Sequence, residues 1–289
     1  MSEPTQFVNA PAGNRIAVDR FGPEDGPAVI LLPGSAQTRH SWRRTARRLG
    51  DAGRAVWSAD LRSHGDSDPA PDGDYSYPRL MEDALALLDA ANGPAALVGA
   101  SVGGKIFLAA AAALPPAAIA CLVLVDAVSR TNRDGAARVA ELVRSPPDGF
   151  ASVREAAACI ARFSGRDVAS DAEARLRRSM RRRADGRWSW HWDAPFFDDA
   201  QGLGISPSLR MLEDAATRIA APTMLIRGER SDFVNAEGTA ALAALMPQLE
   251  VAVLPGAGHM ILGDHNDCIH GIADRLPGPP VADNRQGMR

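Results

Sequence analysis

Short apolar runs alternate with helical patterns along most of this chain, and the alternation limits the possible folds more than any other feature. Continuous apolar runs are typical of strands that are covered on both faces, and strands separated by helices pair in parallel through right-handed crossovers. The sequence therefore predicts an α/β fold built on a mostly parallel sheet. The expected strands of this sheet are Ala28–Leu32, Ala55–Ala59, Ala95–Val98, Ile119–Val125, Thr223–Arg227 and Leu249–Leu254.

Two further strands and six helices complete the expected core. Phe7–Asn9 and Arg15–Phe21 flank the turn at Pro11–Asn14 and predict a hairpin, which brings the sheet to eight strands. Apolar residues spaced three and four apart predict helices between the parallel strands. These helices are expected at Ser41–Ala52, Tyr77–Ala91, Lys105–Leu114, Leu209–Thr217, Ala236–Leu245 and about Asp267–Leu276.

The alternation stops between residues 129 and 208. This segment shows helical patterns at Ala136–Arg144, Val153–Phe163 and Ala172–Arg183 but no run that is typical of a buried strand. We interpret it as a helical cap domain inserted into a core domain formed by residues 1–128 and 209–276. Residues 277–289 are rich in proline, glycine and polar groups, so a loose tail is expected there.

Composition indicates a soluble protein with a small-molecule partner. The 289 residues carry a formal net charge of −3, which gives no general attraction to nucleic acid. No stretch of about 18 apolar residues predicts a membrane span, and the N-terminus lacks the pattern of an export signal. Cys121, Cys159 and Cys268 are odd in number and lack metal-ligand spacing, so reduced thiols, no metal and a cytoplasmic location are expected. The sequence gives no indication of the oligomeric state.

The stretch Gly99-Ala100-Ser101-Val102-Gly103 carries the clearest chemical signal. It joins a predicted strand to a predicted helix, and its two glycines lie where side chains would collide if strand and helix crowd around a strained turn. The hydroxyl of Ser101 would then project above the strand end. The first N–H groups of the following helix would face the same space, which suits a nucleophile whose attack creates negative charge.

A serine nucleophile needs a base that is itself oriented by a third group. His259 lies on a glycine-bracketed loop after the last predicted strand, where catalytic groups gather in open parallel sheets. Two aspartates follow strand ends and could orient it. We favour Asp232, because the chain order Ser, Asp, His then places the acid one strand before the histidine, and Asp126 stays as the alternative.

Together these motifs resemble the α/β-hydrolase superfamily, specifically members with a helical cap after the sixth strand. The resemblance covers residues 5–276 and also includes Gly228-Glu229-Arg230-Ser231-Asp232, Gly258-His259 and the loop His64-Gly65-Asp66-Ser67. It implies that Ser101 is the nucleophile, His259 the general base and then acid, and Asp232 the orienting acid. The implied oxyanion hole consists of the main-chain N–H groups of Val102 and Ser35, with Ala36 as an alternative to Ser35.

Two positions depart from the family pattern. The family often has His-Gly after the third strand, whereas Pro33-Gly34 stands there in this chain. It also often has Gly-His-Gly where this chain has Ser63-His64-Gly65. Neither departure touches the three residues of the expected triad.

The resemblance and the residues together predict a serine hydrolase that uses no cofactor and cleaves a small ester, lactone or related acyl compound. The cap aromatics could line a pocket for a hydrophobic or aromatic substrate, or could only attach the cap to the sheet. Cofactor-free dioxygenases, hydroxynitrile lyases, perhydrolases and carbon–carbon bond hydrolases keep a serine at the same place and stay open, as does a non-catalytic receptor. The predicted substrate-binding residues are Ala36, Trp188, Trp190, Trp192 and Phe196.

Overall fold

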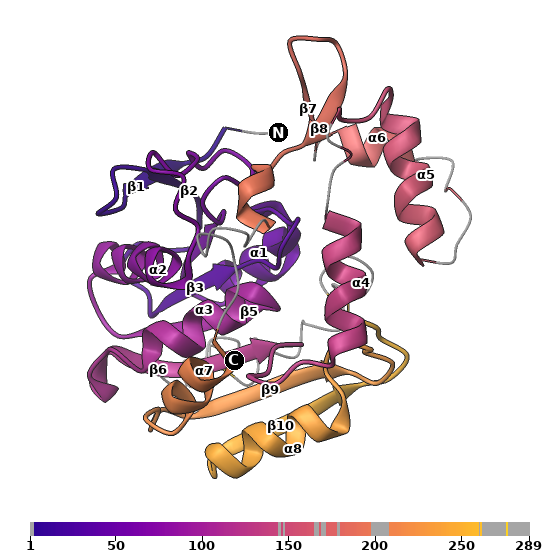
Figure 1. The fold of residues 1–289 in the computed structure, drawn as a ribbon. Helices are drawn as coiled ribbons and strands as arrows, with labels where there is room; N and C mark the ends of the chain where they lie inside the picture. The colour runs from indigo at the N-terminus through magenta and orange to yellow at the C-terminus, as the bar shows by residue number, and fades with distance from the viewer. Residues whose placement is uncertain are drawn as a thin grey trace, which may run out of the picture.

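The computed structural model contains a single large sheet of eight strands in the order β1-β2-β4-β3-β5-β6-β9-β10 (Figure 1). The second hairpin strand, β2, pairs antiparallel to both of its neighbours, β1 and β4, and all pairs from β4 to β10 are parallel, as predicted. The strands are β1 (Gln6–Asn9), β2 (Arg15–Phe21), β3 (Ala28–Leu32), β4 (Ala55–Ala59), β5 (Ala95–Ala100), β6 (Ile119–Val125), β9 (Thr223–Gly228) and β10 (Leu249–Leu254). The structure describes residues 3–143, 146, 148–164, 168, 172–177, 180–197, 208–259, 261 and 276.

The central strands bury both faces, because alternate residues of a strand point to opposite sides and helices cover each side. In β3, Ile30 and Leu32 belong to one apolar cluster, while Val29 and Leu31 belong to the other. All four are at most 3% exposed, so the strand reads as a continuous apolar run. This double coverage explains why the sequence pattern predicts a parallel sheet correctly.

Helices cover the two faces unequally. The larger apolar cluster lies between the sheet and residues of α2, α3, α7 and α8, whereas residues of α1 pack on the smaller cluster. The core helices are α1 (Arg43–Asp51), α2 (Tyr77–Ala91), α3 (Val102–Ala111), α7 (Leu209–Ala216) and α8 (Ala236–Leu245), with short 3-10 turns η1 (Arg39–Trp42) and η2 (Pro116–Ala118). Each of the five lies within or next to a helix that the sequence predicts.

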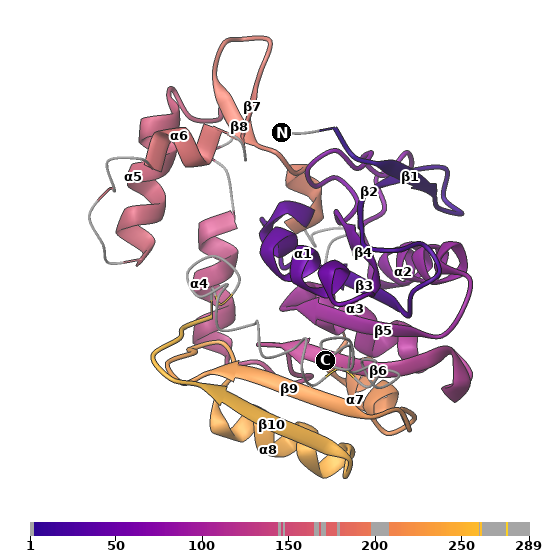
Figure 2. The same ribbon diagram turned by 180° about the vertical axis from the view of Figure 1, so that it is seen from behind.

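The inserted segment is mainly helical, as predicted, but it is not purely helical. It contains α4 (Arg133–Val143), α5 (Val153–Ser164), α6 (Ala172–Leu176) and the turn η4 (Ala194–Phe197), but also an antiparallel hairpin of β7 (Met180–Arg182) and β8 (Trp188–Trp190). The helix expected at Ala172–Arg183 is therefore wrong at Met180–Arg182, where the chain forms β7. In both views α5, α6 and the hairpin lie together, away from the large sheet (Figures 1 and 2).

A buried ion pair fixes the polar loop that follows β4. The Arg62 guanidinium makes two hydrogen bonds to the Asp83 carboxylate on α2, at 2.6 and 2.7 Å, and Arg62 is fully buried. It also donates to the main-chain carbonyls of Asp74 and Arg79. A bidentate arginine pair of this kind fixes geometry on both sides, so the loop that carries His64 is attached rigidly to α2.

Several predictions fall outside the described residues, namely the tail at 277–289, Cys268 and the last helix at 267–276, of which only Leu276 is described. Cys121 is buried and Cys159 half-buried, and neither forms a disulfide. Burial raises the pKa of the Cys121 thiol to about 11. In the described ranges, no helix combines the length and apolar character that a membrane span requires.

Candidate active site

Ser101 lies at a sharp turn between β5 and α3, as the sequence predicts. Its backbone has φ 47° and ψ −115°, a conformation that is costly for a residue with a side chain. A Cβ on Gly99 would lie 2.5 Å from the main chain of Gly103, and one on Gly103 would lie 2.5 Å from the carbonyl oxygen of Pro33. The two glycines therefore allow the strand, the helix and the β3 loop to approach closely enough to hold this turn.

His259 is brought to Ser101 from the loop that follows β10. Its Nε2 atom lies 3.3 Å from Oγ of Ser101, and its side chain is 10% exposed. The ring of Phe233 packs on the imidazole with a centroid separation of 4.2 Å and restricts its orientation. The fold therefore brings together the predicted pair, Ser101 and His259, which are 158 positions apart in the chain.

The acid next to His259 is Asp126 and not the favoured Asp232. Oδ2 of Asp126 lies 2.7 Å from Nδ1 of His259, and the Asp126 side chain is 2% exposed. Asp232 lies exposed on the loop after β9. The loop after β9 explains this difference from the prediction. The side chain of Ser231 points inward and donates to Asp126, whereas the next residue, Asp232, is exposed.

The Asp126 carboxylate is held by groups from the β9 loop. The N–H of Gly228 donates to Oδ1 at 3.0 Å, and Oγ of Ser231 donates to Oδ2 at 2.6 Å. Ser231 in turn accepts hydrogen bonds from the N–H groups of Phe233 and Val234. Sequence reasoning missed Ser231, although its position inside the Gly-x-x-Ser-Asp run was the available signal.

The loop after β3 presents its N–H groups toward several partners. The N–H of Gly34 donates to Oε1 of Gln37 at 3.0 Å, and the N–H of Ala36 donates to Nε2 of His64 at 3.3 Å. Within the described part of the chain, neither the N–H of Ser35 nor that of Val102 donates a hydrogen bond. This leaves Ser35 and Val102 as the available pair of donors, whereas the N–H of the alternative, Ala36, is engaged.

His64 positions this loop and was not identified as a functional residue from the sequence. Its Nδ1 lies 3.1 Å from the carbonyl oxygen of Arg62, so Nδ1 carries the proton and Nε2 is free to accept from Ala36. Complete burial lowers the pKa of His64 to about 4, which keeps the ring neutral near pH 7. Ser63, which replaces a family glycine, adopts φ 61°, the left-handed conformation that a glycine would take most easily.

The predicted cap aromatics form a packed cluster. Trp190 and Trp192 stack with ring centroids 5.1 Å apart, and Trp192 stacks on His64 at 5.8 Å. Phe196 is fully buried and contacts the rings of His64 and Tyr75. These contacts attach the cap to the loop after β4. A contact of these rings with a substrate stays a prediction.

The arrangement contains the groups that acyl transfer requires. A hydroxyl, an imidazole and a buried carboxylate lie in hydrogen-bonding order, and two N–H donors are available on the loop after β3 and in the first turn of α3. The described residues include no group of three or more histidine, cysteine, aspartate or glutamate side chains that could hold a metal ion.

Comparison with protein families gives one match that covers most of the chain. The model of the alpha/beta hydrolase fold family matches residues 27–266. Among curated proteins, an esterase of Mycobacterium tuberculosis, Rv0045c, is 31% identical over 94% of this chain and 90% of its own length. A pimeloyl-[acyl-carrier protein] methyl ester esterase of Xanthomonas oryzae pv. oryzae is 31% identical over 87% of this chain and 95% of its own length.

Solved structures give the same result at the level of the fold. An alpha/beta hydrolase from Novosphingobium aromaticivorans superposes with a TM-score of 0.76 at 27% identity, covering 94% of this chain and 96% of that one. The crystal structure of the Mycobacterium tuberculosis esterase superposes with a TM-score of 0.71 at 27% identity, covering 94% and 89% of the two chains.

Proposed function

Because the chain belongs to the α/β-hydrolase family, we propose that it is a serine hydrolase that cleaves a small ester, lactone or related acyl compound through an acyl-enzyme. One observation carries the proposal. The side chains of Ser101, His259 and Asp126 form a continuous chain of hydrogen-bonding contacts at the carboxyl edge of the sheet. A half-buried serine next to an oriented imidazole is an arrangement that suits acyl transfer.

In the first step His259 takes the proton of Ser101 as its oxygen attacks the substrate carbonyl. Asp126 holds Nδ1 of the imidazole, so that Nε2 faces the serine, and stabilises the imidazolium that forms. The same histidine then gives the proton to the leaving alcohol. In the second step it activates a water molecule, which releases the acid from Ser101.

The N–H groups of Ser35 and Val102 are proposed to bind the oxyanion that develops on the carbonyl oxygen. The two groups come from the loop after β3 and from the first turn of α3. Removing one such donor commonly costs about 100-fold or more in rate. The hydrogen bonds of Gly34 to Gln37 and of Ala36 to His64 would keep the loop in the conformation that presents Ser35.

The substrate is proposed to be a hydrophobic or aromatic acyl compound. Two relatives are named as esterases, which supports an ester over other acyl linkages. Trp190 and Trp192 belong to the apolar cluster of the inserted segment, and the rings of Trp192 and Phe196 pack against His64. Large rings of this kind favour apolar ligands when they line a cavity.

The experiment is labelling by a fluorophosphonate probe, combined with turnover of p-nitrophenyl acyl esters. We expect the native protein to label and to hydrolyse the esters, and the Ser101→Ala variant to do neither. Ester turnover that survives in Ser101→Ala would refute the mechanism. A native protein that binds substrate-like esters without labelling would favour the receptor, and oxygen uptake on aromatic substrates would favour an oxygenase.

A further inference from the structure

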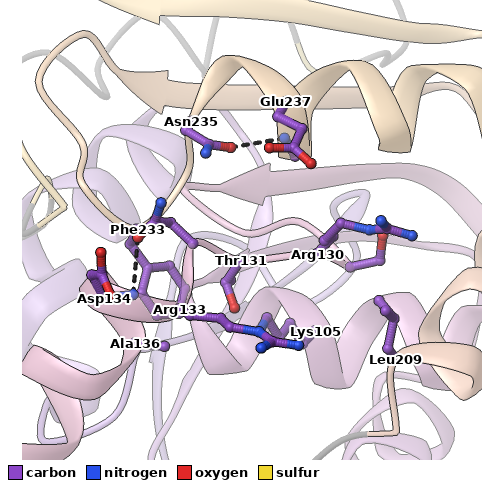
Figure 3. A pocket seen from close by; sticks show the side chains of 13 residues that line it. Lys105, Arg130, Thr131, Arg133, Asp134, Ala136, Leu209, Phe233, Asn235 and Glu237 are labelled. Atoms are coloured by element: carbon purple, nitrogen blue, oxygen red, sulfur yellow. Dashed lines mark hydrogen bonds between the residues drawn. The ribbon is translucent and has the colours of Figure 1, made fainter.

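A cavity of about 890 Å³ opens beside the triad and is bounded by α3, the loop between β6 and α4, and the start of α8. Its lining includes Lys105, Arg130, Arg133, Phe233 and Asn235, which are drawn in Figure 3. Neither Ser101 nor His259 is among the described residues that line it. Phe233 is the connection, because its ring packs on His259 and also lines the cavity. The volume suits an organic molecule rather than a bare ion.

Lys105 is the only lysine in the sequence, among 31 arginines. It is 8% exposed, and within the described part of the chain no carboxylate pairs with it. Its Nζ lies 5.2 Å from the centre of the Phe233 ring. Burial without an acidic partner disfavours the charged amine and lowers the pKa of Lys105 to about 8. An ammonium group in this setting has a strong tendency to bind an anion.

Two helix N-termini face the same cavity. Asn132 precedes α4, which has 11 residues, and Asn235 precedes α8, which has 10. The Asn132 side chain accepts from the N–H groups of Asp134 and Gly135, and that of Asn235 accepts from Gly238. The capped ends therefore offer few free donors, but their dipoles add positive potential to that of Lys105.

The formal charges that line the cavity are nearly balanced, so they do not oppose the binding of an anion. The lining contains three cationic side chains, Lys105, Arg130 and Arg133, and two carboxylates, Asp134 and Glu237. Arg130 donates to Glu213 on α7 at 3.0 Å, so its charge is partly balanced outside the cavity wall. The wall also contains apolar side chains, among them Phe233, which would accommodate the carbon skeleton of a ligand.

We propose that this cavity binds an organic molecule that carries a carboxylate or phosphate group, with Lys105 as the residue that pairs with the anionic group. The four supporting observations are the cavity, the unpaired buried amine, the two helix ends and the apolar wall. The proposal does not depend on the proposed esterase function, because neither residue of the Ser101–His259 pair is among the described residues that form the cavity wall.

The single lysine makes a direct test possible. Protein labelled with [13Cε]lysine gives one lysine signal in an NMR spectrum, and its chemical shift reports the protonation of Lys105. At constant ionic strength we would add succinate, glycerol 3-phosphate or the neutral analogue succinamide. We expect at least one anion to give a saturable change in the chemical shift and to raise the pKa of Lys105 by about one unit. A rise of one unit means that the anion binds the charged amine about tenfold more tightly than the neutral amine. Succinamide should give no shift.

Two variants give an independent measure by calorimetry. Lys105→Met should weaken binding of the anion at least about tenfold, because a charge-assisted hydrogen bond is lost. Arg210→Met is the matched control, since Arg210 is an exposed cation on α7 whose side chain is 90% exposed, and it should leave binding unchanged. Ser101→Ala should also leave binding unchanged, which separates this proposal from the proposed function.

The response to the two anions identifies the ligand class, carboxylate for succinate and phosphate for glycerol 3-phosphate. The absence of a saturable shift with both anions would overturn the proposal, as would an equal response to succinamide. Unchanged affinity in Lys105→Met would do the same. The NMR titration uses the native sequence, so the test holds even where a variant fails to fold.

Discussion

Nδ1 of His259 lies 2.7 Å from Oδ2 of Asp126, a residue 133 positions earlier in the chain, at the end of β6. The carboxylate is buried and receives two further hydrogen bonds, so it is held in one orientation toward the imidazole. An acid at this position fixes the tautomer in which Nε2 faces Ser101. The carboxylate beside the imidazole therefore comes from the end of β6, whereas the sequence favoured the end of β9.

The first prediction concerns this acid. Replacing Asp126 by Asn removes the negative charge and allows the wrong tautomer of His259, so kcat for p-nitrophenyl esters should fall by about 100-fold to 10,000-fold. Asp232→Asn provides the matched control, because the same chemical change is made at an exposed aspartate on the β9 loop. The kcat of that variant should stay within about twofold of the native value. A larger loss in Asp232→Asn than in Asp126→Asn would restore the acid favoured from the sequence.

The sequence could not distinguish the two aspartates because both follow strand ends at the same edge of the sheet. The decision depends on the loop after β9, where Gly228 and Ser231 both donate to Asp126. Asp126 also has φ 47°, a left-handed conformation that turns the chain sharply after β6. These are tertiary contacts, and chain order alone does not reveal them.

The strands, the core helices, Ser101 and His259 could be predicted because local patterns determine them. Buried parallel strands give apolar runs, and the strained turn at Ser101 needs glycine at both flanking positions. The β7–β8 hairpin could not be predicted in the same way. Each of its strands is only three residues long and buries one residue, Met180 in β7 and Trp190 in β8. Three residues are too few to show a period-two pattern.

The second prediction concerns Ser231, which donates to Asp126 at 2.6 Å. Ser231→Ala removes a hydrogen bond to a charged group, so kcat should fall about tenfold while KM changes little. Ser231→Thr keeps the hydroxyl and should recover most of the activity. Ser231 also accepts from two main-chain N–H groups, so thermal unfolding of both variants should be measured in parallel. A loss of activity that simply follows the loss of folded protein would argue against a positioning role.

The third prediction concerns the glycines of the Ser101 turn. A Cβ on Gly103 would lie 2.5 Å from the Pro33 carbonyl oxygen and 2.7 Å from that of Leu32, and main-chain atoms cannot move aside easily. Gly103→Ala should therefore destabilise the protein by about 1–3 kcal/mol and lower kcat, because the β3 loop carries Ser35. Urea denaturation gives the first quantity and ester turnover the second.

Gly93 supplies the control for that substitution. A Cβ built on Gly93 meets no atom within 4 Å, and its backbone does not need a positive φ. Gly93→Ala should leave both stability and turnover near the native values. Equal effects of the two alanine substitutions would show that close approach at Gly103 is not what holds the turn.

The last prediction uses the buried amine of Lys105. Its pKa is lowered from 10.5 to about 8, so the unfolded chain binds the proton more tightly than the folded protein does. At any pH where the folded protein carries Lys105 in its charged form, the buried charge lowers the free energy of unfolding, because the unfolded chain binds that proton more favourably. The cost is largest below pH 8 and disappears as the pH rises toward 10.5. It corresponds to about 3 kcal/mol.

Lys105→Met should therefore be more stable than the native protein below pH 8, by up to about 3 kcal/mol, and the difference should close at higher pH. Urea denaturation of both proteins across this range measures the difference directly, and other titrating groups cancel because the two proteins share them. Arg210→Met, which changes an exposed cation, should show no pH-dependent difference. A difference that stays constant with pH would mean that packing of the methionine, and not removal of a buried charge, determines the effect.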